Sequence, residues 1–243
     1  MLETDSMTGI ARAKSILDVT SSMAVIAGVA ALLWMQFFRA VPAPQRIGPI
    51  AISGTKIETA RIRHLVGTSK IVLIEFADFE CPVCYSYAAK THPKLKREFI
   101  DTGRLSYAFV NFPLSEIHLN ALRSSYAAEC ADKSGKYWQM LDRLFSRERS
   151  LSTTGLMTYA DDIGLTAPAF SKCLNGEVAS AIQSDVDMGR QLDVAGTPTF
   201  FLGTLGSDGV IALAVRFNGL TSYEALGSAV ASLGVPSPDK PTL

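Results

Sequence analysis

The sequence predicts an α/β domain whose sheet is interrupted by a helical insertion, with one transmembrane helix before that domain. A short apolar run rich in β-forming residues, KIVLIEFADF at 70–79, suits a central strand buried on both faces. The block 117–194 has helical periodicity, and it separates this strand and its neighbour at 105–114 from strand candidates at 197–203 and 210–219. The transmembrane helix is predicted by an uncharged stretch near the N-terminus.

That stretch, VTSSMAVIAGVAALLWMQFF at 19–38, contains no Asp, Glu, Lys or Arg. As a helix it would be roughly 30 Å long, which matches the hydrocarbon core of a bilayer. Trp34 stands near one end, where aromatic residues of membrane interfaces are common. We therefore expect a transmembrane anchor at 19–38, preceded by a short cytoplasmic tail at 1–18.

Two other interpretations of 19–38 are a buried helix of a soluble core and a cleaved signal peptide. The length of the apolar run argues against cleavage, as do Pro42 and Pro44, which follow it without a clear A-x-A site. Basic residues lie on both sides of the run, so the positive-inside rule does not decide the orientation.

The residues after the anchor divide into a linker, a domain and a tail. The stretch 39–55 has three prolines and a glycine among its first eleven residues and is expected to be a stiff linker. The folded domain is expected at 56–235, and a disordered tail at 236–243. The formal net charge is zero, with acidic and basic residues interleaved, which argues against nucleic acid as a partner.

Within the domain, a long helix is expected from Cys81, bent or broken near Pro93. The strand at 105–114 should end at Pro113, and a last helix is expected around 221–233. Inside the helical block, apolar residues recur at helical spacing and should share a buried face, as at Leu119, Leu122, Tyr126 and Cys130.

Two of the four cysteines, Cys81 and Cys84, are separated by only two residues. Such a pair can be a metal clip, a structural crosslink or a redox pair. Zinc would need two more ligands at similar spacing, but Cys130 and Cys173 stand singly and far away, and the histidines form no ligand pair. We therefore expect no metal site.

A redox pair suits this position in the chain. Cys81 falls where a strand ends and a helix begins, so the free N–H groups and the helix dipole should stabilise its thiolate. Cys84 lies one turn inside the helix and should be better shielded. The sequence thus predicts an exposed nucleophile and a protected resolving thiol, and Pro82 is tolerated in the first turn.

Two distant residues support the redox interpretation. Glu75 lies within the predicted buried strand, where a carboxylate could accept a proton from Cys84, although a position at an exposed strand edge is the alternative. In GTPTF at 196–200, Pro198 opens a β-rich run, which suits a tight turn or a cis peptide.

These motifs together resemble the DsbA-like branch of the thioredoxin superfamily, which has a thioredoxin fold with an inserted helical domain. The motifs are EFADFECPVC at 75–84, NFPLSEIHLNAL at 111–122, YAAECADKSGKYWQMLDRLF at 126–145 and GTPTFFLG at 196–203. By this resemblance Cys81 is the attacking cysteine and Cys84 the resolving one. Glu75 matches the buried acid, Pro198 the cis-proline beside the disulfide, and Thr197 the residue that touches the thiol and the substrate.

The sequence also departs from that family. Its strongest oxidants carry a histidine between the cysteines that donates to the thiolate, and Val83 cannot do so. Asp78 and Glu80 add negative charge nearby, which opposes thiolate formation. His118 resembles a recurring histidine of the family, although a helix cap or a core hydrogen bond explains it equally well.

Cys130 and Cys173 form a separate question. They are either two inert buried thiols or a disulfide, and some relatives in this branch carry such a bridge. A disulfide would close a long loop, worth about 4 kcal/mol, and it requires an oxidising compartment. The bridge would therefore place the tail inside the cell and the domain outside.

The sequence thus predicts a membrane-anchored, extracytoplasmic thiol–disulfide oxidoreductase that forms disulfides in exported proteins through Cys81 and Cys84. We expect it in the bacterial inner membrane as a single-pass protein, with the domain in the periplasm or outside the cell. No cofactor is expected, and an integral-membrane partner should reoxidise the pair. The alternatives are a reductase or isomerase of the same fold, a tethered chaperone or binding module, and a copper-delivery protein.

Overall fold

The computed structural model describes residues 28–29, 32, 34, 48–147 and 150–234. It divides the chain into two units, Met1–Gln45 and Arg46–Leu243. The expected tail at 1–18, nearly all of the expected anchor at 19–38 and the expected C-terminal tail at 236–243 lie outside the described residues. Among the residues that are described, none of the helices has both the length and the apolar character needed to span a membrane.

The second unit is built on a mixed sheet with β4 (Ile71–Ala77) at its centre. β4 runs parallel to β5 (Ser106–Asn111) and antiparallel to β6 (Thr199–Leu205), which pairs in turn with β7 (Val210–Asn218). All seven residues of β4 are buried, as expected for an apolar strand covered on both faces. The predicted α/β domain is therefore confirmed.

Three short strands at the sheet edges were not predicted. β1 (Ile50–Ala51) and β2 (Lys56–Glu58) pair with β7, and β3 (His64–Val66) pairs with β5. The sheet order is β1-β7-β6-β4-β5-β3, and a short 3₁₀ turn, η1 (Thr59–Arg61), follows β2. β1 lies within the stretch 39–55 that was expected to be a linker.

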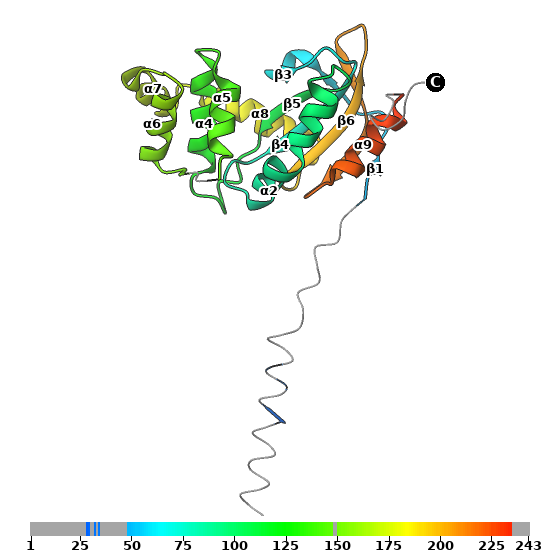
Figure 1. The fold of residues 1–243 in the computed structure, drawn as a ribbon, viewed down its shortest axis with the longest axis horizontal. Coiled ribbons are helices and arrows are strands. Elements are labelled where there is room, and N and C mark those ends of the chain that lie inside the picture. The colour runs from blue at the N-terminus through cyan, green and yellow to red at the C-terminus, as the bar shows by residue number, and fades with distance from the viewer. Residues whose placement is uncertain (1–27, 30–31, 33, 35–47, 148–149, 235–243) are drawn as a thin grey trace, which may run out of the picture. The chain divides into compact units, whose positions relative to one another are not determined.

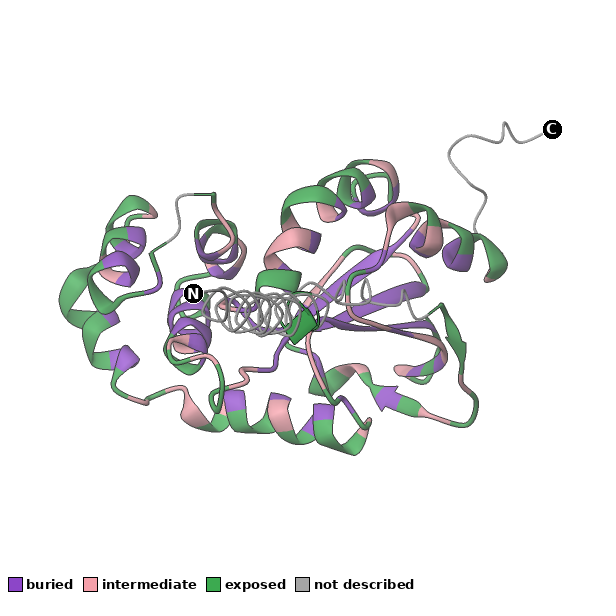
Figure 2. Cartoon of the chain, turned by 90° about the horizontal axis from the view of Figure 1, so that it is seen from below, coloured by how far each residue is buried: buried purple, intermediate pink, exposed green. Residues whose placement is uncertain are grey.

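Helices cover both faces of the sheet (Figure 1). One face is covered by α2 (Pro82–Lys90), α3 (His92–Leu95), the π turn η2 (Lys96–Ile100) and α9 (Tyr223–Ser232), and the other by α8 (Ala179–Gln191). The long helix predicted from Cys81 is interrupted at Thr91, because Pro93 has no N–H to continue the ladder. Buried residues concentrate on the central strands and on the inward sides of these helices (Figure 2).

The helical insertion is confirmed, but its first turn is not helical. It consists of α4 (Ala121–Asp132), α5 (Tyr137–Leu144), α6 (Thr153–Asp162) and α7 (Ala167–Leu174), followed by α8. The predicted buried face is wrong at its start, because Leu119 is 92% exposed and Leu122 is 37% exposed. The carboxylates of Asp78 and Glu80 accept the N–H groups of Leu114 and Asn120, which holds 112–120 as a loop.

A buried polar cluster joins the insertion to the sheet. Nη2 of Arg63 lies 2.8 Å from Asp185 on α8 and 3.1 Å from Glu129 on α4. Asn111 at the end of β5 donates to both carboxylates, and His64 on β3 lies 2.8 Å from Glu129. Burial favours protonation of Glu129, but the hydrogen bonds from His64 and Arg63 prevail and lower its pKa. The cluster thereby fixes the helices α4 and α8 to the strands β3 and β5.

A disulfide joins Cys130 on α4 to Cys173 on α7. The two residues are 43 positions apart in the sequence and their Cα atoms lie 5.8 Å apart. Both are buried among apolar residues of the insertion. The bridge therefore ties the peripheral helix α7 to α4, the helix that carries Glu129.

We expect the double variant Cys130→Ala/Cys173→Ala to lose about 4 kcal/mol of unfolding free energy, because the unfolded chain regains the entropy of the open loop. Urea unfolding measures this loss. Replacing both cysteines leaves no unpaired thiol at the position. A double variant as stable as the wild type would show that the bridge adds nothing to the fold.

Candidate active site

Cys81 caps the N-terminus of α2, directly after the loop that leaves β4. Its backbone is extended (φ −61°, ψ 121°), and its carbonyl accepts the first helical hydrogen bond, from Tyr85 N at 3.0 Å. Pro82 occupies the first turn, where no backbone donor is needed. The side chain of Cys81 thus lies at the positive end of a nine-residue helix.

Cys81 and Cys84 are both free thiols, and they differ in exposure. Cys84 is fully buried, whereas Cys81 is 4% exposed. The prediction that the nucleophile is exposed is therefore wrong: Cys81 is buried, with only a small opening above it. Cys81 is covered because its Sγ lies 3.4 Å from the Thr197 carbonyl oxygen, at the end of the loop that leads into β6.

The two thiols also differ in acidity. A hydrogen bond from the Cys84 thiol lowers the pKa of Cys81 to about 5; burial opposes this shift, while the side chain of Thr197 and the backbone of Val83 and Cys84 support it. Burial raises the pKa of Cys84 well above its usual value, and the neighbouring Cys81 raises it further. At neutral pH the pair therefore consists of one thiolate and one thiol.

Glu75 lies in the middle of β4 and is 2% exposed, so the alternative of an exposed strand edge is excluded. The hydroxyl of Tyr107 on β5 donates a hydrogen bond to Glu75 Oε2. Burial raises the pKa of Glu75 to about 8; the hydrogen bond from Tyr107 opposes the shift, and the charge of Cys81 adds to it. The charge of Glu75 in turn contributes to the raised pKa of Cys84.

The peptide bond between Thr197 and Pro198 is cis, immediately before β6 begins at Thr199. Gly219 N, just after β7, donates to the Pro198 carbonyl at 2.8 Å, and the Thr199 hydroxyl donates to Gly196 O at 2.7 Å. These contacts hold the loop so that the Thr197 carbonyl lies against Cys81. The structure thus brings together the five residues singled out in the sequence, Glu75, Cys81, Cys84, Thr197 and Pro198.

Asp78 and Glu80 fix the loop before Cys81. Asp78 is fully buried; its Oδ2 accepts from Leu114 N and lies 2.8 Å from His118 Nδ1, and its Oδ1 accepts from Glu80 N. Glu80 accepts from the backbone N and the side-chain amide of Asn120. The sequence alone indicates that the charges of both acids oppose formation of the thiolate. Their hydrogen bonds show that they attach the 112–120 loop to the active-site loop.

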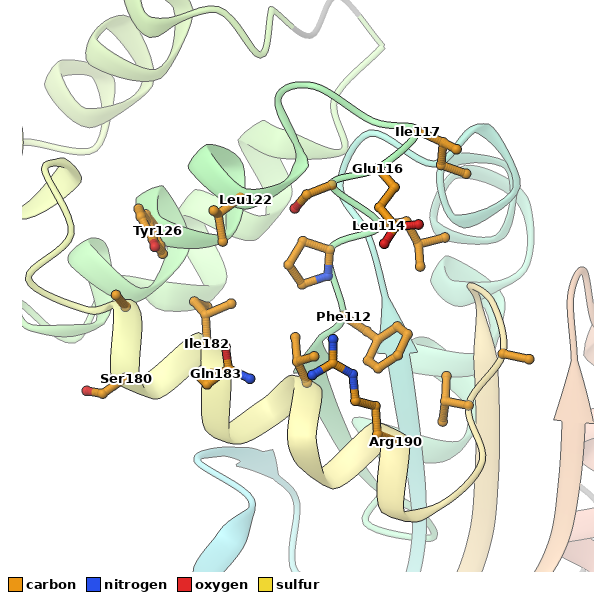
Figure 3. Close-up of a pocket in the computed structure, with 16 residues that line it drawn as sticks. Phe112, Leu114, Glu116, Ile117, Leu122, Tyr126, Ser180, Ile182, Gln183 and Arg190 are labelled. Carbon is orange, nitrogen blue, oxygen red and sulfur yellow. The ribbon is translucent and has the colours of Figure 1, made fainter.

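A cleft of about 750 Å³ lies between α8 and this 112–120 loop (Figure 3). Ile117 and Leu122 line it on one side, and Ile182 and Arg190 of α8 on the other. It continues to Val194 and Ala195, a few residues before Thr197. The wall of this cleft is mostly apolar and extends toward the cis-proline loop.

The described residues contain one group with metal-ligand chemistry, His64, Glu129 and Asp132, whose ligand atoms lie within 4.8 Å of one another. The Glu129 carboxylate already accepts hydrogen bonds from Arg63 and Asn111. This group does not include either thiol of the Cys81 pair.

Sequence reasoning missed Tyr107 and the structural role of Asp78. Tyr107 carries a hydroxyl on β5, opposite Leu73 of β4, and Leu73 lies two residues before Glu75 on the same face of that strand. A polar group on a buried strand next to a buried acid was the available signal for Tyr107. Asp78 stands in the motif FADFEC, but only the folded loop shows that its two carboxylate oxygens accept hydrogen bonds from Leu114 N and Glu80 N.

Alkylation of Cys81 should reach half of its maximal rate near pH 5, because the thiolate is the reactive species and its pKa is about 5. At pH 7 about 99% of Cys81 should then be ionised. The variant Cys84→Ala should move the midpoint upward by more than about one pH unit, since it removes the largest stabilising hydrogen bond. Thr197→Val is the control and should shift it less; a wild-type midpoint above pH 8 would contradict the assignment.

Comparison with known proteins agrees with this geometry. The family model described as Thioredoxin matches residues 64–209. The Na(+)/H(+) antiporter NhaA 3 of Salinispora tropica is 31% identical over 163 residues, which is 67% of this chain and 23% of the antiporter, so the chain spans about a quarter of that relative. Disulfide bond formation protein D of Bacillus subtilis is 24% identical over 144 residues, which covers 54% of this chain and 63% of that protein.

Among solved structures, α-DsbA1 of Wolbachia pipientis matches with a TM-score of 0.60 and 21% identity. The match covers 80% of this chain and 93% of that one, and therefore includes the helical insertion as well as the sheet. The resemblance noted in the sequence is confirmed: the chain belongs to the thioredoxin family and has the DsbA-like form of its fold.

Proposed function

We propose that the protein is a thiol–disulfide oxidoreductase that forms disulfides in exported proteins. One observation supports this above all others: a thiol of low pKa, Cys81, lies beside a buried thiol of high pKa, Cys84, under a cis-proline loop. A purely structural pair has no need of this difference in acidity. The chemistry needs no cofactor, since the two sulfur atoms hold the electrons.

In the oxidising direction, a client thiolate attacks Sγ of Cys81 in the oxidised pair. The client sulfur bonds to Cys81, the Cys81–Cys84 bond breaks, and the Cys84 sulfur leaves with the electron pair and takes a proton. A second client thiolate then attacks the first client sulfur and expels Cys81 as a stable thiolate. The client has lost two electrons, and Cys81 and Cys84 have gained them.

The acidity of Cys81 favours this direction. Stabilising the thiolate stabilises the reduced protein, which makes the disulfide a stronger oxidant. A pKa of about 5 lies between the values of about 7 for thioredoxin and about 3.5 for DsbA, whose potentials are about −270 and −120 mV. We therefore expect a potential of roughly −200 mV.

The location follows from the second cysteine pair and from the N-terminal sequence. A buried disulfide between Cys130 and Cys173 persists in an oxidising compartment. The uncharged stretch 19–38 has the length of a membrane span. We propose a single-pass anchor in the bacterial inner membrane, with the domain in the periplasm or outside the cell and an integral-membrane partner that reoxidises the pair.

Exposed apolar side chains lie on the first turns of α2 and α4 and on the loops at 112–120 and after β7, and they favour polypeptide clients. We call them the apolar rim: Val83, Ile117, Leu119, Leu122 and Leu220. Loop contacts bring them to the site, since Asp78 and Glu80 hold 112–120 and Gly219 N binds Pro198 O. Unfolded proteins expose apolar side chains next to their cysteines, so such a rim would bind them in preference to small thiols.

Equilibration with glutathione buffers tests the direction of electron flow. We expect the Cys81–Cys84 pair to be half reduced near −200 mV, read by the alkylation of the two thiols. A potential near −270 mV would rule out the oxidase and favour a reductase. The Cys130→Ala/Cys173→Ala variant is the control, because it should give the same potential from the active pair alone.

The apolar rim gives a second test. The variant Ile117→Ser/Leu119→Ser should lower kcat/KM for a reduced, unfolded protein by about 30-fold, because each of the two exposed apolar side chains contributes about 1 kcal/mol when it is covered. Its reaction with glutathione should stay unchanged. Ile50→Ser, an exposed apolar residue on β1, is the matched control. An equal loss with both substrates would contradict a polypeptide-binding role.

A further inference from the structure

Each turnover proposed above needs a proton at a buried position. When the Cys81–Cys84 bond breaks, the Cys84 sulfur is fully buried and its pKa is raised well above the usual value, so it must be protonated. Glu75, with a pKa of about 8 caused mainly by burial, holds a proton at neutral pH and can supply it. Glu75 is itself 2% exposed and must then regain a proton from water.

The route past the cysteines is a poor one for this proton. Cys81 is 4% exposed, and in the mixed disulfide the client sulfur lies on that same small opening. A second route begins at the hydrogen bond that the Glu75 carboxylate accepts from β5. Tyr107 donates this hydrogen bond and is the only hydrogen-bond partner of that carboxylate within the described part of the chain.

Tyr107 also lines a cavity of about 490 Å³. The cavity lies between the α2–α3 segment, the end of β3 and helix α5 of the insertion. Lys96 and Asp101 stand on its wall as an ion pair whose side chains are about half exposed, so the cavity reaches solvent. Its volume has room for several water molecules at about 30 Å³ each.

Two buried polar atoms near this cavity have no hydrogen-bond partner among the described residues, His92 Nδ1 and Tyr87 Oη. His92 lines the cavity, and its ring lies 4.7 Å from that of Tyr107 and 6.0 Å from that of Tyr87. A buried polar atom without a partner costs about 1–3 kcal/mol, and water in the cavity would remove that cost. Burial and then Lys96 lower the pKa of His92 to about 4, so its ring is neutral and can accept or donate a hydrogen bond.

We propose that Tyr107 and this cavity form a proton port, through which Glu75 exchanges its proton with solvent during thiol–disulfide exchange. The Tyr107 hydroxyl passes its proton to the Glu75 carboxylate and at the same time accepts one from cavity water next to His92. A phenol can do both, since its oxygen donates one hydrogen bond and accepts others. In the reverse reaction the proton leaves Glu75 by the same route. The port rests on the proposed function, because it serves the proton of Cys84.

Four other titratable groups line the cavity, and each could in principle affect the pH dependence that the test measures. Lys96 and Asp101 come from η2 and its end, Asp142 from α5, and His92 from α3. Burial raises the pKa of Asp142, and Lys96 opposes that shift. All four line the cavity, and the structure gives none of them a hydrogen bond to Glu75.

Stopped-flow reduction of the oxidised full-length protein by a reduced client tests the port. Tyr107→Phe should slow the reduction of the Cys81–Cys84 disulfide by about 10- to 100-fold at pH 7, because the loss of a group that transfers protons has an effect of about this size. It should also shift the midpoint of the pH profile upward, because the hydrogen bond that lowers the pKa of Glu75 is gone. Added imidazole, which fits the cavity and carries protons, should restore most of the rate.

Two further variants separate the port from a structural effect. Ala88→Leu fills the cavity wall without touching the Tyr107 hydroxyl and should slow the reaction in the same way. Tyr159→Phe on α6 removes another largely buried hydroxyl, which accepts from Ser150 N, and should leave the rate unchanged. A Tyr107→Phe variant that melts like the wild type and keeps its rate overturns the port, as does a slow variant that imidazole does not rescue. A wild type that fails to exchange at all would instead reject the proposed function.

Discussion

The site depends on a single negative charge, held on Sγ of Cys81 in a largely buried group of three acids. Cys81, Cys84 and Glu75 are close enough that the charge of each affects the others, and burial penalises every charge added. The pKa of Cys81 falls to about 5, that of Glu75 rises to about 8, and that of Cys84 rises above both. This order decides that Cys81 leaves without a proton and that Cys84 cannot.

The order of acidity depends on where the loops hold the three groups. Asp78 is buried next to the thiolate, but its oxygens accept from Leu114 N and Glu80 N and contact His118, so its charge is compensated locally. The same hydrogen bonds fix the loop before Cys81 against the 112–120 loop. With Val83 between the cysteines, the thiolate is stabilised by the Cys84 thiol, by the side chain of Thr197 and by backbone N–H groups, without an imidazole.

Much of this arrangement could be predicted from the sequence, for identifiable reasons. β4 is marked by an apolar run, and the redox residues stand in two short motifs, EFADFECPVC and GTPTF. The resemblance to the DsbA-like family indicated that these distant motifs form one site. The strands β1 to β3 have two or three residues each, too few to show a period. The loop around Leu119 has helical spacing, yet long-range acceptors on Asp78 and Glu80 determine its path. Tyr107 was missed because its role depends on a neighbour 32 residues away.

The insertion therefore acts on the site from two directions. On the cysteine side, the 112–120 loop that leads into it carries Ile117 and Leu119 of the apolar rim, and α4 carries Leu122. On the opposite side, Trp138, Leu141 and Asp142 of α5 form a wall of the cavity behind Tyr107, and the Trp138 ring lies 6.0 Å from the Tyr107 ring. Burial is the largest cause of the raised pKa of Glu75, so a sheet without this cover would expose the acid and lower that pKa. The helical domain thus helps to keep the pKa of Glu75 high, which the proposed transfer of its proton to the Cys84 sulfur requires.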